Sequence, residues 1–266
     1  MPNLNLTYFL KQQFYELNRK DRIVKDFLEK ADAKDVLIKA FNSERLNEGI
    51  NETRLFSFIN ENLSPSKPDL IKYFEESVEE DVALLFIDIS SFSKTIKGYS
   101  NKMIKDYLDS YYKDIIPIIY ENGGEIEKLM GDGIICVFGK PFLNLTSPEY
   151  VYKAETCAEA AIKQFYKTNK NVKVAIHKGT INYYKVPGEH YGEYTIIGQP
   201  LTDLYRLESV SIQNSLNFYA GASYDKLGWT KSIFNEDEVI GKNIRIGKLQ
   251  EVDYSEIRII QFRGFN

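Results

Sequence analysis

Two aspartates in the middle of the chain have the type and placement expected of a site for metal ions and phosphate. Asp88 ends the apolar run 82–87, and Asp132 lies in the turn sequence Gly131-Asp132-Gly133. Magnesium in proteins is usually held by one or two carboxylates together with the phosphates of a substrate. A pair of aspartates can also hold two such ions about 4 Å apart, which stabilises both the attacking and the leaving oxygen of a displacement.

The residues after Asp88 offer backbone groups to the same phosphate. The segment from Ile89 to Ser93 opens a helix, and the N–H groups at a helix start bind anions at the positive end of the helix dipole. Both aspartates also have a purely structural interpretation, because Asp before a helix is often a cap and Asp-Gly is often hairpin chemistry. The expected topology brings the end of the first strand and the hairpin turn together, and an aspartate occurs at each. This coincidence favours a metal site over the purely structural interpretation.

The elements that position the aspartates follow the order strand, helix, strand, strand, helix, strand. The continuous apolar run 82–87 is typical of a strand buried on both faces. Helical spacing follows from 94 to 120, with Pro117 expected to kink or break the helix near its end. Two short strands at 125–130 and 134–138 then flank the Asp132 turn, which is a strong hairpin signal.

The second half of the chain completes a split β-α-β pattern. Its expected elements are a helix at 147–166 with Ser147 as N-cap, a strand at 172–178 ending at Gly179, a short strand at 194–198, a helix at 200–210, a strand at 216–220, and a hairpin of 243–248 with 256–262. The pattern predicts an α+β fold, a ferredoxin-like palm whose antiparallel sheet has helices on one face. The first strand and the hairpin are neighbours in it, so Asp88 and Asp132 converge at one sheet edge.

Residues 1–78 have a different pattern from the main domain expected at 79–266. Apolar residues recur there at helical spacing, and Ser64-Pro65-Ser66-Lys67-Pro68 is the clearest linker signal in the chain. We expect a helical N-terminal appendage. It is either a regulatory surface or a plain helical cover, and the sequence leaves both open.

The amino-acid composition indicates which classes of partner and which cellular compartment to expect. The 266 residues are 43% hydrophobic and 27% charged, with a formal net charge of −4, which is typical of a globular protein and gives no case for nucleic acid or an anionic membrane as partner. We find neither a membrane-spanning run nor a signal peptide. Cys136 and Cys157 form no disulfide framework. These features predict a cytoplasmic protein.

Five short motifs, in this order, resemble the catalytic domain of class III nucleotidyl cyclases. They are Phe86-x-Asp88-Ile89-Ser90-x-Phe92-Ser93, Gly124-x-x-x-Lys128-x-x-Gly131-Asp132, Val174-Ala175-Ile176-His177-x-Gly179, Tyr194-Thr195-x-Ile197-Gly198 and Arg206-Leu207-Glu208. The resemblance covers about 81–222, and the ordered set is specific where a single motif is weak. Gly123-Gly124-Glu125 is also similar to the turn of diguanylate cyclases. In that family the acidic residues follow the glycines directly in the hairpin, whereas the hairpin turn of this chain is Gly131-Asp132-Gly133, so this chain does not fit the diguanylate cyclase pattern.

The resemblance implies a reaction and a composite site. A nucleoside triphosphate would lose pyrophosphate as its ribose 3′ oxygen attacks the α-phosphorus, in a head-to-tail homodimer with active sites at the interface. One subunit would bind two divalent ions, Mg²⁺ or Mn²⁺, through Asp88, Asp132 and the backbone carbonyl of Ile89. The resemblance and the helix-start argument assign the remaining substrate contacts: Lys128 and Thr195 to the base, Arg206 to the transferred phosphoryl group, and Ser90, Ser91, Phe92 and Ser93 to the phosphates.

One departure from the family pattern bears on the substrate. Purine cyclases of this family usually carry Val-Asn in the helix after the glycine, where the asparagine orients the ribose, whereas this chain has Leu201-Thr202. Thr202 keeps a hydroxyl but is shorter. The pyrimidine cyclases of bacterial anti-phage (Pycsar) systems are small stand-alone enzymes that also depart here. We therefore expect cyclic UMP or cyclic CMP as product, with an adenylate cyclase or a catalytically dead nucleotide-binding module as the alternatives.

Overall fold

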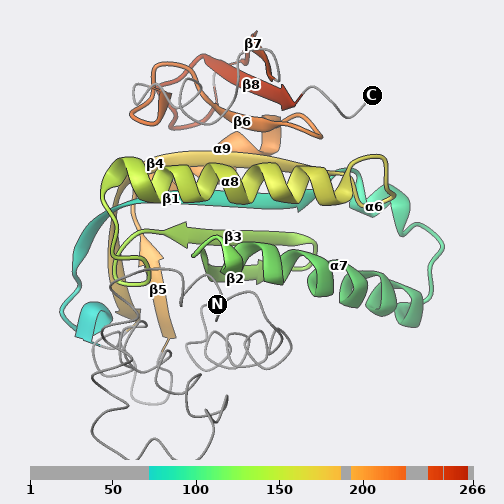
Figure 1. Ribbon diagram of the computed structural model, residues 1–266, viewed down its shortest axis with the longest axis horizontal. Coiled ribbons are helices and arrows are strands. Elements are labelled where there is room, and N and C mark those ends of the chain that lie inside the picture. Colours follow the sequence, from blue (N-terminus) through green and yellow to red (C-terminus); the bar gives the residue numbers. More distant parts are fainter. Residues whose placement is uncertain (1–71, 187–192, 226–238, 248, 263–266) are drawn as a thin grey trace, which may run out of the picture.

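Figure 1 shows the computed structural model, which describes residues 72–186, 193–225, 239–247 and 249–262. The expected appendage at 1–78 and its linker lie outside these residues, apart from 72–78. The elements are β1 (Glu79–Ile89), α6 (Phe92–Thr95), α7 (Asn101–Glu121), β2 (Glu125–Met130), β3 (Gly133–Phe138), α8 (Ser147–Phe165), β4 (Val172–Val186), β5 (Glu193–Ile197), α9 (Gln199–Val210), β6 (Leu216–Tyr219), β7 (Val239–Arg245) and β8 (Glu256–Phe262).

The strands form one sheet in the order β2-β3-β1-β4-β6-β8-β7, with β5 paired to β4. β1 is antiparallel to both of its neighbours, β3 and β4, which confirms the split β-α-β arrangement. The sheet is mixed and not wholly antiparallel, because β4 and β6 run parallel. The α+β fold class predicted from the sequence is therefore confirmed, with this correction to the sheet.

β1 explains why helices cover both faces of the sheet. Its odd-numbered residues from Ala83 to Ile89 join one core cluster with α7 and α8, which lie in front of the sheet in Figure 1. Its even-numbered residues from Val82 to Phe86 join a second cluster with Leu204 and Leu207 of α9. The expectation of helices on one face only is wrong, because a strand that is apolar on both faces leaves a second apolar surface to bury.

The helical stretch expected at 94–120 is two helices, α6 and α7. Gly98 has a φ of +88° between them, and Ser100 restarts the helix by accepting a hydrogen bond from the Met103 N–H at 3.3 Å. Pro117 lies within α7, which continues to Glu121, so the proline does not end the helix. A proline inside a helix removes its own N–H bond and its ring crowds the carbonyl of residue i−4, and burial of the neighbouring Ile115 and Ile119 holds the helix together despite this cost.

Three further boundaries differ from the sequence pattern. Thr146, and not Ser147, is the N-cap of α8, and its N–H donates to Glu149 at 2.8 Å in a capping box. β4 continues through Gly179 to Val186, and a Cβ at Gly179 would lie 2.5 Å from Pro200 of α9, so this glycine permits close packing of helix on strand and does not end the strand. The hairpin strand expected at 243–248 is β7, which begins and ends earlier.

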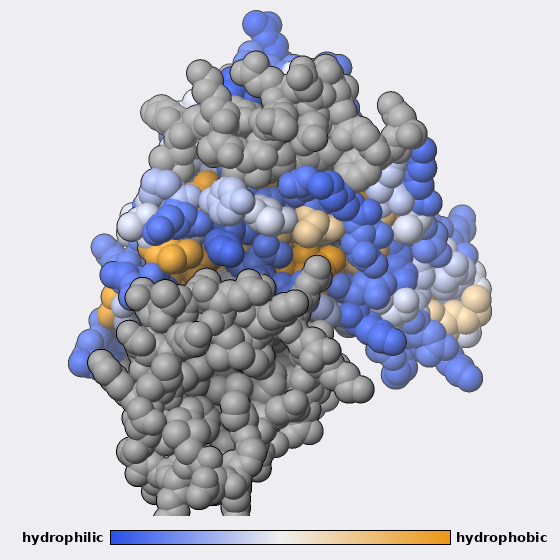
Figure 2. All heavy atoms as spheres, in the orientation of Figure 1, coloured by the Kyte–Doolittle hydropathy of each residue, from blue (hydrophilic) through white to orange (hydrophobic). Residues whose placement is uncertain are grey.

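The described surface is predominantly hydrophilic on the face shown in Figure 2, where hydrophobic residues occur in separate small patches. Scattered exposed apolar residues are normal for a globular protein. Cys136 and Cys157 are both free and buried, as expected from the absence of a disulfide framework. Among the helices of the described residues, none has the length and apolar character needed to cross a bilayer.

Glu155 of α8 is a buried acidic residue whose hydrogen-bond partner, Tyr224, belongs to the larger core cluster. Its side chain is 1% exposed and accepts a hydrogen bond from the Tyr224 hydroxyl at 2.6 Å. The other carboxyl oxygen has no partner within the described residues. Burial raises the pKa of Glu155 from 4.5 to about 8, and the Tyr224 hydrogen bond opposes this shift.

This buried acid predicts a pH-dependent effect of Glu155→Gln. Between about pH 4.5 and 8 the folded protein holds a proton that the unfolded chain releases, so the Glu155 contribution to stability falls as pH rises through this window. Glutamine does not titrate, so Glu155→Gln does not lose stability in this way. The free energy of unfolding of the variant, relative to that of the wild type, should therefore increase by roughly a few kcal/mol between pH 5 and pH 8. Denaturant unfolding at both pH values measures this, with exposed Glu121→Gln as control. Parallel pH curves for wild type and Glu155→Gln would contradict the assignment.

Candidate active site

Asp88 and Asp132 meet at one edge of the sheet, as the split β-α-β pattern predicts. In the β1–β3 register Ile87 lies opposite Ile134, which brings the end of β1 to the turn before β3. The Asp88 carboxyl group lies near enough to Asp132 for the negative charge of Asp132 to raise the pKa of Asp88. A Cβ at Gly133 would lie 2.8 Å from the Phe86 ring and 3.4 Å from Asp88 Oδ1. Glycine at that position therefore lets the turn approach β1.

Burial disfavours negative charge on both carboxyl groups, and the two charges also repel each other. The pKa of Asp88 is raised to about 7 by burial first and by the charge of Asp132 second, while Lys173 opposes the shift. Burial also raises the pKa of Asp132. No cluster of three or more His, Cys, Asp or Glu side chains suited to a metal was found in the parts of the chain that the structure describes. Two close carboxylates that repel each other fit a hard divalent ion that also binds substrate phosphates.

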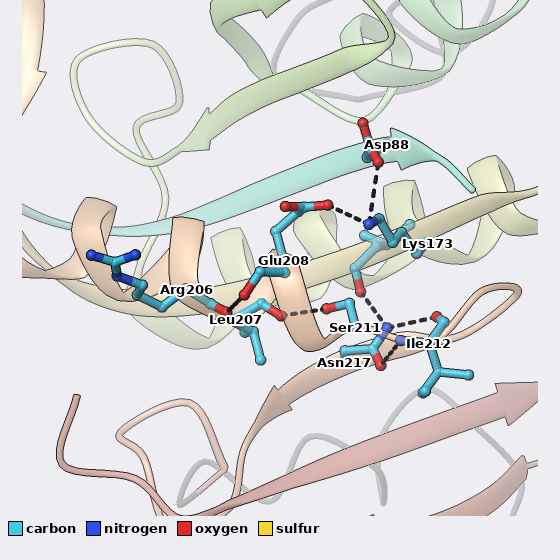
Figure 3. A network of polar contacts seen from close by, with 10 residues as sticks. Asp88, Lys173, Arg206, Leu207, Glu208, Ser211, Ile212 and Asn217 are labelled. Atoms are coloured by element: carbon cyan, nitrogen blue, oxygen red, sulfur yellow. Dashed lines mark hydrogen bonds and ion pairs between the residues drawn. The ribbon is translucent and has the colours of Figure 1, made fainter. Parts of the chain in front are cut away.

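Lys173 and Glu208 complete the polar network around Asp88, as Figure 3 shows. Lys173 lies opposite Asp88 in the β1–β4 register, and its Nζ is 3.4 Å from Asp88 Oδ2 and 2.5 Å from Glu208 Oε1. Sequence reasoning missed Lys173 and gave Glu208 no role. One sequence feature could have identified Lys173: it is a charged residue inside the otherwise apolar strand segment Val172 to Ile176, which pairs with the end of β1.

The segment after Asp88 is less open than a complete anion cradle. The Ser90 N–H donates to the Asn171 carbonyl at 2.8 Å, so this group is already engaged. Ser91 has a φ of 60° and precedes the short helix α6. The N–H groups of Phe92 and Ser93 have no acceptor among the described residues, and the Ser90 hydroxyl is buried without one. The cradle expected from Ile89 to Ser93 is thus reduced to its later N–H groups.

Lys128 and Thr195 lie on two strands that a buried acid connects. The β2–β3 register shifts between Ile126 and Lys128, which leaves Glu127 as the extra residue of a β-bulge. Glu127 is 7% exposed and accepts hydrogen bonds from the Thr195 hydroxyl at 3.1 Å and the Ile196 N–H at 3.2 Å. Burial raises its pKa to about 8, and both hydrogen bonds oppose the shift. The sequence pattern gave no indication of this contact.

Thr202 and Arg206 lie one turn apart on α9 and so share a helix face. In Figure 3 the Arg206 guanidinium points away from the carboxyl group of Asp88. One chain therefore brings Asp88, Asp132 and Lys173 together and brings Thr195 to the strand of Lys128, whereas its Arg206 guanidinium points away from Asp88.

Comparisons with known proteins agree with this fold. The family model described as the adenylate and guanylate cyclase catalytic domain matches residues 74–243, more than half of the chain. No curated protein sequence matches the chain.

Several solved cyclase structures share the fold at low sequence identity. The adenylyl cyclase CyaB from P. aeruginosa has a TM-score of 0.58 and 18% identity, covering 69% of this chain and 95% of that one. The guanylyl cyclase Cya2 has a TM-score of 0.55 and 18% identity, covering 70% and 93%. The catalytic core of a rhodopsin-guanylyl cyclase with converted specificity, in complex with ATPαS, has a TM-score of 0.57 and 17% identity, covering 71% and 99%. With the family match across the catalytic region, the chain belongs to the class III adenylate and guanylate cyclase family and is a nucleotidyl cyclase.

Proposed function

We propose that this protein converts a pyrimidine nucleoside triphosphate to its 3′,5′-cyclic nucleotide and pyrophosphate with the help of two divalent metal ions. The observation that carries the proposal is the convergence of Asp88 and Asp132 beside a phosphate-compatible lysine, Lys173. Attack of a ribose oxygen on phosphorus needs little covalent participation by the protein. Positioning and charge stabilisation provide most of the rate in such displacements.

The metal ions would be Mg²⁺ or Mn²⁺, held by Asp88, Asp132 and the backbone carbonyl of Ile89. The donor set fits, because these are hard oxygen ligands, and a bound cation would offset both the burial of the two carboxyl groups and their mutual repulsion. When bound, the ions supply Lewis-acid stabilisation of the attacking and leaving oxygens. The N–H groups of Phe92 and Ser93 and the ammonium group of Lys173 would bind the triphosphate beside them.

The second half of each site would come from the partner in a homodimer. Arg206 is a half-buried cation on α9 whose guanidinium points away from Asp88 of its own chain, which supports a role in the other site. Its guanidinium would stabilise the charge that develops on the transferred phosphoryl group. Lys128 and Thr195 would contact the base from the same subunit as Arg206.

The preference for a pyrimidine rests on Thr202 and on the resemblance to anti-phage cyclases. Thr202 stands on the first turn of α9, where purine cyclases of the family usually place asparagine. A role in bacterial anti-phage signalling, in the cytoplasm, is part of the same proposal. An adenylate cyclase is the alternative enzyme, and a nucleotide-binding module without turnover is the alternative class.

An assay with four nucleotides separates these possibilities. Purified protein with Mn²⁺ is given ATP, GTP, CTP or UTP, and products are identified by mass spectrometry. We expect one cyclic nucleotide for each pyrophosphate released, from CTP or UTP. Turnover of only ATP or GTP would remove the pyrimidine assignment, and binding without pyrophosphate release would remove the cyclase reaction.

Thr202→Asn tests whether this position helps to select the base. Asparagine is longer and offers the amide that purine cyclases use toward the ribose, so we expect ATP turnover relative to CTP or UTP to rise roughly tenfold. Thr202→Ser keeps the hydroxyl and serves as the control. An unchanged ratio of the kcat/KM values in Thr202→Asn would separate this position from base selection.

A further inference from the structure

The turn that carries Asp132 is the tip of the β2–β3 hairpin. The two strands pair as far as Met130 and Gly133, so the two residues between them form a loop beyond the last pair. Gly131 has a φ of +66°, and apart from its chain neighbours no atom of the described residues lies within 4 Å of the place where its Cβ would be. Packing on that side of the loop therefore does not determine where Asp132 lies.

A tyrosine of α7 contacts this loop directly. The Tyr112 hydroxyl donates a hydrogen bond to the carbonyl oxygen of Gly131, which is 19 positions further along the chain. That carbonyl belongs to the planar peptide unit that also contains the N–H and the Cα of Asp132. A hydrogen bond to the Gly131 carbonyl therefore limits rotation of this peptide plane, and it restrains Asp132 at its Cα.

The helix that carries Tyr112 is itself held firmly. The neighbouring Tyr111 is fully buried, and its ring centroid lies 5.2 Å from that of Phe165 on α8. Ile115 and Ile119 follow one and two turns later and are buried in the same core cluster. Figure 1 shows α7 beside the β2–β3 hairpin. A donor on a well-packed helix can position a neighbouring site more precisely than a donor on a loop.

The Tyr112 hydroxyl is suited to act as a neutral donor beside two acids. Burial first and the charge of Asp132 second raise the pKa of the half-buried Tyr112, so its hydroxyl keeps the proton that the hydrogen bond requires. The interaction adds no charge to a site where Asp88 and Asp132 already repel each other. Tyr112 can therefore hold the turn without competing with a cation for the two carboxyl groups.

We propose that Tyr112 is a positioning residue of the metal site, whose hydrogen bond to Gly131 holds Asp132 where it can bind a divalent ion together with Asp88. The inference rests on the proposed function, because it takes the two aspartates as metal ligands. Tyr112 acts through the turn and touches neither the substrate nor the ion. Its hydroxyl should therefore affect the affinity for the metal and not the rate at saturating metal.

Tyr112→Phe keeps the ring and removes only the hydroxyl. The Mn²⁺ concentration that gives half-maximal turnover should rise about fivefold, since a hydrogen bond of ordinary strength changes an equilibrium constant by roughly that factor. The kcat at saturating Mn²⁺ should stay within about twofold of the wild type. Tyr150→Phe is the matched control, because the Tyr150 hydroxyl donates to Asp81 at 2.9 Å near the opposite end of β1. It loses a similar hydrogen bond and should keep the wild-type Mn²⁺ dependence.

Two further measurements do not depend on turnover. In the metal-free protein, amide hydrogen exchange across residues 130–134 should be about fivefold faster in Tyr112→Phe, because losing the hydrogen bond eases local opening of the turn. Tyr150→Phe should leave this exchange unchanged. Thermal unfolding over a range of Mn²⁺ concentrations, with a 3′-deoxynucleoside triphosphate that lacks the attacking oxygen, measures metal binding. The Mn²⁺ concentration that gives half of the shift in Tm should rise about fivefold in Tyr112→Phe.

The possible outcomes separate the role of Tyr112 from the proposed function. A wild-type Mn²⁺ dependence of turnover and unfolding in Tyr112→Phe would overturn the proposal. An equal change in Tyr150→Phe would also overturn it, because the effect would then follow from a general loss of stability. A lower kcat with an unchanged Mn²⁺ dependence would contradict positioning of the metal. Wild-type protein whose turnover and unfolding do not respond to Mn²⁺ would instead contradict the two-metal reaction itself.

Discussion

Asp132→Asn should lower cyclase turnover roughly a thousandfold, because an amide holds a divalent ion far less well than a carboxylate and charge stabilisation is the main source of the rate. The same change should raise the stability of the metal-free protein near pH 8. Asp88 and Asp132 lie side by side, and the charge of Asp132 contributes to the raised pKa of Asp88. Removing one of two adjacent negative charges relieves that repulsion.

Two measurements check this pair of effects. Pyrophosphate release with Mn²⁺ gives the turnover, and thermal unfolding without and with Mn²⁺ gives the stability and its dependence on the metal. The wild type should be stabilised by Mn²⁺ together with substrate analogue, and the variant should lose that response. Asp106→Asn, at an exposed position of α7, is the matched control. Turnover within tenfold of the wild type in Asp132→Asn would exclude the two-metal account.

Arg206→Ala should lower kcat by roughly a hundredfold while changing KM little. The proposed role of Arg206 is to stabilise charge that develops only in the transition state, and losing such an interaction lowers kcat and kcat/KM together. The folded structure should tolerate the change, because Arg206 forms no ion pair among the described residues and its helix is anchored by Leu204 and Leu207.

Steady-state kinetics with the preferred triphosphate measure this split. Arg245→Ala on β7 removes an exposed arginine and should leave both constants unchanged. A rise in KM at constant kcat would instead assign Arg206 to ground-state binding of the substrate. An unchanged kcat would remove it from the reaction.

The convergence of Asp88 and Asp132 was predictable because topology alone determines it. An apolar run that ends in aspartate, a hairpin with Asp-Gly in its turn, and a helical segment between them suffice to place both carboxyl groups at one sheet edge. The continuous apolar character of residues 82–87 also contained the information that both faces of β1 are covered. The one-sided helical layer inferred from the supersecondary motif conflicted with that signal, and the burial pattern was the better guide.

The contacts of Lys173 and Glu127 were not predictable in the same way. Lys173 meets Asp88 only because the antiparallel register of β1 and β4 sets them opposite, and register depends on packing across the whole sheet. Glu127 reaches β5 through a bulge, which interrupts the alternation that sequence patterns report. Gly179 illustrates a third cause, since its role depends on the approach of Pro200 from a distant helix.

The central claim is that the aspartates of one subunit work with Arg206 of the other, and a heterodimer tests it most directly. Asp132→Asn and Arg206→Ala chains are co-expressed with different affinity tags, and dimers that carry both tags are purified. Such a dimer has one intact composite site and one doubly damaged site, so we predict about half of the wild-type activity. Each variant homodimer has no intact site and should remain nearly inactive. Heterodimers no more active than the two homodimers would contradict the account, because sites contained within single chains leave none intact.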